Sequence, residues 1–201
     1  MIDPVDFAGR HFSQIDPVPT EGIVISAEVR GYCQQNSCGK YGRNWACPPA
    51  VAPLDHFRKT LADFDTMLIL REVYPVKDSF DWNGMMAGAK QFRDKLLALK
   101  KEIESFDADF RFLILGAGAC HLCEPCNYVY AKPCRHPQDA IVSLEAGGID
   151  VMRLLKDNGL KYYHGKGTVA YVGGLLYNEH LQGRKDLEEK AGVDDLTQGT
   201  T

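Results

Sequence analysis

Four stretches of the chain carry the apolar patterns that predict β-strands. Over residues 23–30, apolar side chains at every second position give the period of two that is typical of a half-buried strand. Residues 67–74 form an apolar run broken by an Arg-Glu pair, and residues 110–115 and 169–177 are further apolar runs. We therefore predict a sheet of about four strands.

Apolar residues at spacings of three and four predict a long helix over residues 85–106. A coiled-coil seam would give a similar spacing, but the pattern lasts only about three heptads, which favours a helix packed on a sheet. Shorter helices are predicted where proline or aspartate can start them and glycine can end them: residues 54–64, 137–147 and 150–158.

The order of these elements predicts an α/β or α+β sandwich around a central sheet. The strand, helix and strand over residues 67–115 favour a right-handed parallel crossover. Cys33 follows the first predicted strand, and Cys120 follows the third. If those strands are parallel, both cysteine-rich loops emerge at one edge of the sheet, where α/β folds usually bind ligands.

The composition along the chain predicts three parts. Residues 1–20 contain three prolines and are expected to be an irregular lead-in. Residues 21–180 hold all the predicted elements and are expected to form one domain, a length that is ample for a hydrophobic core. Residues 181–201 are polar and charged, and they are expected to form a frayed tail.

The charge and hydropathy patterns exclude several classes of function. The formal net charge of −4 and the lack of a basic face argue against a nucleic-acid partner. No apolar stretch approaches the roughly 18 to 20 residues that a membrane-spanning helix needs. The N-terminal residues lack an apolar signal core, so we expect a cytoplasmic protein. Its seven cysteines, an odd number, would then stay reduced rather than form a disulfide framework.

Those cysteines fall into two clusters. Cys120, Cys123 and Cys126 form a C-x2-C-x2-C run, and Cys134 follows eight residues later. Two-residue gaps let one short loop present three thiolates to a single inorganic centre, which is typical of iron–sulfur proteins. The remaining cysteines lie within residues 31–49, a loop-like segment rich in Gly, Asn, Ser and Pro: Cys33, Cys38 and Cys47.

Thiolates favour soft or borderline metals, so the competing interpretations are an iron–sulfur cluster and zinc. Structural zinc sites usually use two C-x2-C pairs or paired Cys and His. A triple with a distant fourth cysteine is instead the ferredoxin pattern, so we favour an iron–sulfur centre of the 4Fe–4S type, with zinc as the alternative.

Two partitions of the ligands remain open. In the simpler one, Cys120, Cys123, Cys126 and Cys134 hold one cluster, and Cys33, Cys38 and Cys47 form a second site whose fourth position is open or filled by another residue. In the swapped one, Cys47 completes the 120s loop, because Cys47-Pro48 has the Cys-Pro pair that ferredoxins use, and Cys134 joins Cys33 and Cys38. We favour the simpler partition because its loops are more local and cost less entropy to close.

Basic residues within the two segments suit an anionic centre. Lys40, Arg43, Lys132 and Arg135 could offset the charge of several thiolates, and we list Lys40, Arg43 and Arg135 as candidate cofactor-binding residues. Two histidines, His121 and His136, flank the second cluster, where they could be ligands, proton carriers or plain structural residues.

A set of motifs resembles a known family. It comprises Tyr41 to Pro49 (Tyr-Gly-Arg-Asn-Trp-Ala-Cys-Pro-Pro), the C-x2-C-x2-C loop, Cys134-Arg-His-Pro137, and Ser143-Leu-Glu-Ala followed by Gly148-Ile-Asp-Val151. Together they resemble the cysteine-rich "predicted metal-binding protein" family found mainly in anaerobic bacteria and archaea. The resemblance implies metal binding through these cysteines in a cytoplasmic protein. The 120s loop alone also resembles ferredoxins, although the chain lacks their compact twofold cysteine repeat.

Three functions follow from these observations. The first is an iron–sulfur redox protein that exchanges electrons with a partner protein. The second is an iron–sulfur enzyme in which the three-cysteine set keeps an open position for a substrate. The third is a zinc-stabilised binding module. No sequence feature indicates the substrate, the electron partner or the oligomeric state.

Overall fold

The core of the molecule is an antiparallel sheet. The structure is a computed structural model that describes residues 3–107 and 110–179. Its strands are β1 (Gln14–Pro19), β2 (Thr66–Pro75), β3 (Leu113–Leu115) and β4 (Thr168–Tyr177). They form one four-stranded sheet in the order β1-β2-β4-β3, and every neighbouring pair is antiparallel. Of the two predicted fold classes, the α+β sandwich is the one that the structure confirms.

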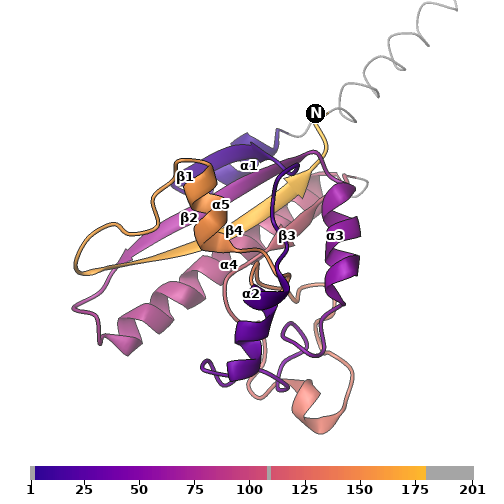
Figure 1. Ribbon diagram of the computed structural model, residues 1–201, viewed down its shortest axis with the longest axis vertical. Coiled ribbons are helices and arrows are strands. Elements are labelled where there is room, and N and C mark those ends of the chain that lie inside the picture. The colour runs from indigo at the N-terminus through magenta and orange to yellow at the C-terminus, as the bar shows by residue number, and fades with distance from the viewer. Residues whose placement is uncertain (1–2, 108–109, 180–201) are drawn as a thin grey trace, which may run out of the picture.

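Five α-helices surround this sheet in the described residues (Figure 1). They are α1 (Pro4–Gly9), α2 (Ala27–Tyr32), α3 (Leu54–Ala62), α4 (Trp82–Phe106) and α5 (Val151–Asp157), with short 3-10 turns η1 (Cys33–Gln35) and η2 (Asn127–Tyr130). The predictions for α3, α4 and α5 are confirmed. The side chain of Asp150 caps α5 by accepting a hydrogen bond from the backbone N–H of Arg153 at 3.0 Å.

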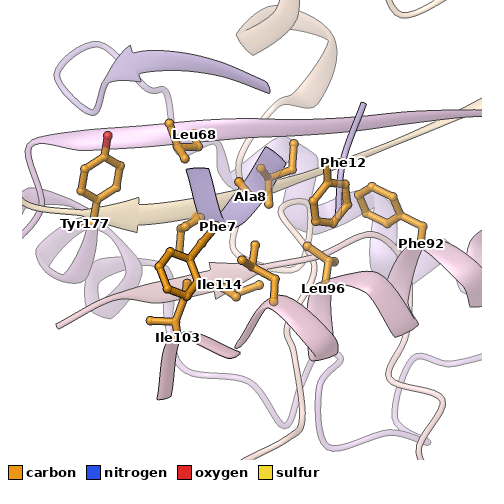
Figure 2. Close-up of a cluster of buried hydrophobic side chains, with 12 residues drawn as sticks. Phe7, Ala8, Phe12, Leu68, Phe92, Leu96, Ile103, Ile114 and Tyr177 are labelled. Carbon is orange, nitrogen blue, oxygen red and sulfur yellow. The ribbon is translucent and has the colours of Figure 1, made fainter. Parts of the chain in front are cut away.

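Both faces of the sheet are covered, because its central strands alternate their side chains between two cores. On β2, Leu68 and Leu70 point to the face covered by α1 and α4, whose packing is drawn in Figure 2. Met67 and Ile69 point to the opposite face, where they meet residues of α3 and α5. All four of these β2 side chains have 0% exposure, which is why the run reads as continuously apolar.

The predicted strand over residues 23–30 is wrong. Only Ile25 makes an isolated bridge, with Ile149, and α2 begins two residues later. The hydroxyl of Ser26 accepts hydrogen bonds from the N–H groups of Glu28 and Val29, which is an N-cap arrangement. The local capping signal therefore prevails over the period-two pattern. Cys33 consequently follows a helix and not the carboxyl end of a strand.

The expected irregularity of residues 1–20 is also wrong, because this stretch contains α1 and β1. Asp3 caps α1 through its side chain, and β1 pairs with β2 in the register Pro17 to Leu68. Proline cannot donate a ladder hydrogen bond, but β1 lies at the edge of the sheet, where one side needs no partner. The predicted tail, residues 181–201, lies outside the described residues.

Two further predictions need correction. Residues 137–147 form turns and an isolated parallel bridge between Gly116 and Ser143, not a helix. The strand predicted over residues 110–115 is shortened to β3. Since β2 and β3 are both antiparallel to β4, they run in the same direction but are separated by it, so the crossover through α4 does not join neighbouring strands.

The two cysteine segments lie together at one end of the molecule. Cys120 follows β3, which is an edge strand, and the first segment follows α2. In Figure 1 the purple loops after α2 lie beside the salmon loop around residues 120–134, at the bottom of the view. The two cysteine-rich loops therefore lie together, as predicted, but not because they follow parallel strands: the sheet is antiparallel and Cys33 follows α2. No helix in the described ranges combines the length and apolarity that crossing a membrane requires.

Candidate metal centre

The first cysteine segment, residues 31–49, is a series of tight turns. Asn36 has a left-handed φ of 53°, and its side-chain oxygen accepts a hydrogen bond from the N–H of Tyr41 at 3.0 Å. The N–H of Gly42, which also has a positive φ of 64°, donates to the carbonyl of Pro48 at 2.9 Å. These bonds close two loops in succession, and the second loop places the Cys47 side chain inside the protein at 9% exposure.

The second cysteine segment, residues 120–134, is held in shape by hydrogen bonds from polar side chains within it and directly after it. The amide of Asn127 donates to the carbonyl of Pro133 at 2.9 Å, which closes the loop that begins at η2. The guanidinium of Arg135 donates to the carbonyl of Pro125 at 2.7 Å. The N–H of His136 points at the sulfur of Cys134 at 3.4 Å, the kind of N–H···S contact that tunes a thiolate ligand.

The buried residue Asn44 connects the first cysteine segment to the second through hydrogen bonds of its side chain. Its side-chain amide donates to the carbonyl of Cys120 at 2.9 Å, and its side-chain oxygen accepts from the N–H of Ala46 at the same distance. Asn44 is only 4% exposed, so each of these bonds satisfies a polar group that is withdrawn from water. This buried clamp fixes the backbone beside Cys47 against the backbone of Cys120.

Trp45 joins the segments a second time, closer to the surface. Its indole N–H donates to the carbonyl of Lys132 at 3.0 Å. Its ring also packs edge-to-face on Tyr128, with 4.9 Å between the ring centroids. Together with the Asn44 clamp, these contacts hold residues 31–49 and residues 120–134 side by side.

The thiols of the first segment are close enough to perturb one another. The pKa of Cys47 is raised to about 12, mainly by burial. The neighbouring thiols of Cys38, Cys33 and Cys120 contribute to this rise, and the positive charge of Lys40 opposes it. The pKa of Cys33 is raised by burial and then by Cys38. Cys33, Cys38 and Cys47 are therefore neighbours, and we call them the three-cysteine set.

The thiols of the second segment form a group of their own. Burial raises the pKa of Cys120, and so do the thiols of Cys123, Cys134 and Cys126, whereas the N–H of Leu122 acts in the opposite direction. We call Cys120, Cys123, Cys126 and Cys134 the four-cysteine set. Since Cys120 also acts on Cys47, the two sets adjoin. All seven cysteines are free thiols.

The donor chemistry of this region fits a thiolate-ligated centre, but the side chains do not converge on a point. Within residues 3–107 and 110–179, no three or more His, Cys, Asp or Glu side chains form a group arranged to hold a metal ion. The structure brings together seven cysteine thiols on two adjoining loops. The buried side chain of Asn44 connects the backbones of these two loops.

The expected basic residues have different surroundings. Lys40 lies within electrostatic reach of Cys47 and forms a 3.4 Å ion pair with Glu124, which again joins the two segments. Arg135 is engaged with a backbone carbonyl of the second segment. Arg43 is exposed and has no side-chain hydrogen bond or ion pair within the part of the chain that the structure describes.

Two arginines beside the thiols are not evident from the sequence. Arg30 interacts electrostatically with Cys33, and its guanidinium lies over Phe57 and donates to the carbonyl of Ala52 at 2.9 Å. Burial lowers the pKa of both Arg30 and Arg93, and Arg93 interacts with Cys120. Arg93 lies in the middle of α4, so no local motif links it to the cysteines.

His121 is held by a charged pair and is not aimed at the thiols. The Nε–H of Arg93 donates to its Nδ1 at 3.1 Å, which leaves Nε2 to donate to Asp94 at 2.7 Å. Both ring nitrogens are thus occupied, as expected for a structural histidine. A small pocket lies beside this group; its walls include Arg93, Cys120, His121 and Gly118.

The sequence profile of one family matches residues 16–177, which include both cysteine segments and all four strands except the first residues of β1. Its description is "Predicted metal-binding protein (DUF2284)". The chain belongs to this family. Membership in DUF2284 supports a bound metal in general terms. No curated protein matches the chain. No solved structure matches it either.

Proposed function

We propose that this DUF2284 protein is an iron–sulfur protein with a redox role. The four-cysteine set would hold a cluster of the 4Fe–4S type, as in the simpler of the two partitions. When bound, such a cluster accepts and donates single electrons. The three-cysteine set would hold a second centre next to it, and an electron-exchanging partner protein would dock nearby.

One observation carries this proposal: the thiols of Cys123, Cys126 and Cys134 lie close enough to Cys120 to raise its pKa. The thiol of the first residue in the C-x2-C-x2-C run therefore lies near the thiols of the other two and of the distant fourth cysteine. The same four thiols are the ligands that the sequence spacing predicts for one cluster. The swapped partition would instead group Cys134 with Cys33 and Cys38.

The chain's own residues prepare the region for an anionic centre in three ways. Cys47 and Cys126 are 9% and 8% exposed, so the protein excludes water from part of the site. The N–H groups of Leu122 and His136 point toward thiols of the four-cysteine set. Arg30, Lys40 and Arg93 supply positive charge beside the two sets, which favours thiolates over thiols.

The deciding experiment is anaerobic purification followed by measurement of iron, acid-labile sulfide and zinc per chain. We expect a brown protein that bleaches with dithionite and contains about four or about eight iron and sulfide ions, for one or two clusters. A colourless protein with stoichiometric zinc would replace this proposal with a zinc-stabilised module. A folded protein without any bound metal would overturn metal binding itself.

A matched pair of variants controls for adventitious iron. Cys123→Ser removes a thiolate from the middle of the 120s loop, and we expect loss of about four iron per chain. Ser37→Ala changes an exposed hydroxyl of the first segment that is not a predicted ligand, and we expect full iron content. Equal loss in both variants would mean that the iron is not held by the cysteines.

A further inference from the structure

The turn η2 exposes two large apolar side chains in the middle of the second cysteine segment. Val129 and Tyr130 are 43% and 59% exposed. Along the chain they lie between Cys126 and Cys134, two members of the four-cysteine set. Aromatic side chains are enriched at the centres of protein interfaces. A protein that covered Val129 and Tyr130 would therefore come close to the proposed cluster.

Hydrogen bonds within the second cysteine segment fix the shape of this turn. The side-chain amide of Asn127 donates to the carbonyl of Pro133 at 2.9 Å, and the N–H of Lys132 donates to the carbonyl of Asn127 at 3.1 Å. The N–H of Ala131, which has a left-handed φ of 50°, donates to the carbonyl of Tyr128 at 3.0 Å. The exposed tyrosine next to Ala131 therefore extends from an ordered backbone, so a partner that binds it pays little entropy for the turn.

Basic residues of both cysteine segments lie close to this turn. Lys132 comes two residues after the end of η2, and its carbonyl accepts the indole N–H of Trp45 at 3.0 Å, which brings Arg43 to the same region. The guanidinium of Arg135 donates to a backbone carbonyl of the second segment at 2.7 Å. We call Arg43, Lys132 and Arg135 the basic set. All three are exposed, and none forms an ion pair within residues 3–107 and 110–179.

The two cysteine segments are basic in a chain that is acidic as a whole. Residues 31–49 and 120–137 hold four of the 23 Lys and Arg residues but only one of the 27 Asp and Glu residues. That single acidic residue, Glu124, is paired with Lys40 at 3.4 Å. The basic residues are far apart in sequence, and the fold gathers them at the end of the molecule shown at the bottom of Figure 1.

The charge and the size of this surface favour an acidic protein as the partner. A protein that makes about six to ten phosphate contacts to a nucleic acid needs more basic side chains than this surface offers. A second copy of the chain, docked symmetrically through this surface, would place like charges opposite each other. Small interfaces are instead typical of transient electron-transfer complexes, in which complementary charge speeds the encounter.

We propose that Val129, Tyr130 and the basic set form a docking face for an acidic one-electron carrier protein. The inference rests on the proposed iron–sulfur function and names the chemistry of its partner. Tyr130 supplies the apolar contact, and the basic set attracts acidic side chains around it. In each encounter one electron passes between the carrier and the cluster of the four-cysteine set, so that one is oxidised and the other reduced, and no bond is made or broken.

The test uses flavodoxin, an acidic flavin protein, as the carrier. Anaerobic stopped-flow absorbance measures the rate at which its hydroquinone reduces the iron-loaded protein and becomes the semiquinone. Arg43→Glu combined with Lys132→Glu reverses two charges of the docking face, and Tyr130→Ala removes its apolar contact. Lys161→Glu combined with Lys166→Glu is the matched control, because it makes the same change of net charge in the exposed loop before β4.

At about 0.1 M salt, where exposed charges are screened beyond about 10 Å, we expect the charge-reversed docking face to be reduced about tenfold more slowly than wild type. Tyr130→Ala should also be slower, and the control pair should stay within about twofold of wild type. Iron content should match wild type in every variant. Equal slowing in the two double variants would overturn the docking face, because the rate would then follow net charge alone. Wild-type rates in both docking-face variants would overturn it as well.

A second measurement does not depend on the cluster. Carbodiimide joins carboxylates of flavodoxin to lysines of the as-purified protein that they contact, and mass spectrometry identifies those lysines. We expect cross-links at Lys132 and not at Lys161 or Lys166. If the wild-type protein lacks iron, cross-links at Lys132 would keep the docking face while the redox function fails. Cross-links elsewhere, or binding of RNA or anionic vesicles in place of flavodoxin, would overturn the acidic protein partner. If the charge-reversed variant loses iron, Tyr130→Ala and the cross-links decide.

Discussion

The side-chain amide of Asn44 donates a 2.9 Å hydrogen bond to the carbonyl oxygen of Cys120, across 76 positions of the chain. Asn44 also accepts from the N–H of Ala46, two residues along. One side chain thereby orders the loop that carries Cys47 and attaches it to the start of the second cysteine segment. The arrangement of the seven thiols on two loops depends on this clamp, which is built from protein groups alone.

Replacing Asn44 with alanine leaves a buried carbonyl and a buried N–H without their partners. We expect Asn44→Ala to lower the free energy of unfolding of the metal-free protein by about 1–3 kcal/mol, the cost of unsatisfied buried polar groups. Anaerobic urea unfolding, followed by circular dichroism, measures the change. Asn127→Ala is the matched control, because that amide donates to a carbonyl of its own loop at a more exposed site. A larger loss for Asn127→Ala would contradict the role assigned to Asn44.

Serine substitutions distinguish the two ligand partitions. Under the simpler partition, Cys47→Ser disturbs only the centre of the three-cysteine set, and Cys134→Ser disturbs only the cluster of the four-cysteine set. Under the swapped partition, Cys47→Ser disturbs the cluster held by Cys120, Cys123 and Cys126, and Cys134→Ser disturbs the centre held by Cys33 and Cys38. Iron content and low-temperature paramagnetic resonance of the two anaerobic variants measure which signal each one loses. We expect Cys134→Ser to remove the signal that Cys123→Ser also removes, and Cys47→Ser to leave it in place.

Much of the fold could be predicted because burial leaves a strong pattern. The β2 run and the apolar face of α4 were evident, since β2 is buried on both sides and α4 lies along the sheet. Residues 23–30 have the alternating apolar pattern of a strand, yet the side chain of Ser26 caps a helix there. Over so few residues, this local hydrogen bonding outweighs the alternating pattern. Residues 1–20 contain prolines that an interior strand excludes but an edge strand tolerates.

The site could be predicted only as far as its residues are close in sequence. The C-x2-C-x2-C spacing predicts one group of thiols, whereas the contact of Cys47 with Cys120 depends on how two loops pack. Arg93 interacts with Cys120 from α4, so its place beside the thiols follows from tertiary structure alone. No cysteine lies near Arg93 along the chain that would have indicated it.

The raised pKa of Cys47 predicts how the metal-free protein responds to pH. With a pKa of about 12, the thiol stays protonated in the folded state at pH values where an unfolded cysteine, with a pKa near 9, is already ionised. Stability that is present below about pH 9 is therefore lost as the pH rises toward about 12, because the unfolded state binds fewer protons. We expect the free energy of unfolding under anaerobic, metal-free conditions to fall between pH 8 and pH 10.5.

Alkylation measures the same pKa at the residue itself. The thiolate is the species that reacts with iodoacetamide, so the rate at Cys47 should rise about tenfold for each pH unit between pH 8 and pH 11. Peptide mapping by mass spectrometry identifies the modified residue, and the exposed Cys38 serves as the internal control. A rate at Cys47 that levels off near pH 9 would show that its thiol is not perturbed.

The chain has two tryptophans, and their positions allow metal binding to be followed by fluorescence. Trp45 lies two residues before Cys47, and its indole N–H donates a 3.0 Å hydrogen bond to the carbonyl of Lys132 in the second cysteine segment. Trp82 starts α4 and is 68% exposed. A centre held by the thiols absorbs light in the range of indole emission, and quenching by energy transfer weakens steeply with distance. We therefore expect loading with iron and sulfide to quench Trp45 far more than Trp82.

Two variants assign the quenching to one residue. Trp82→Phe should keep the metal-dependent loss of emission, and Trp45→Phe should remove most of it. Trp45→Phe retains an aromatic ring against Tyr128 but loses the indole hydrogen bond, which costs about 0.5–1.5 kcal/mol of stability and leaves the fold intact. If instead Trp82→Phe removes the quenching, the bound centre lies near the start of α4 and not between the two cysteine segments, because emission from Trp45 would then be insensitive to it.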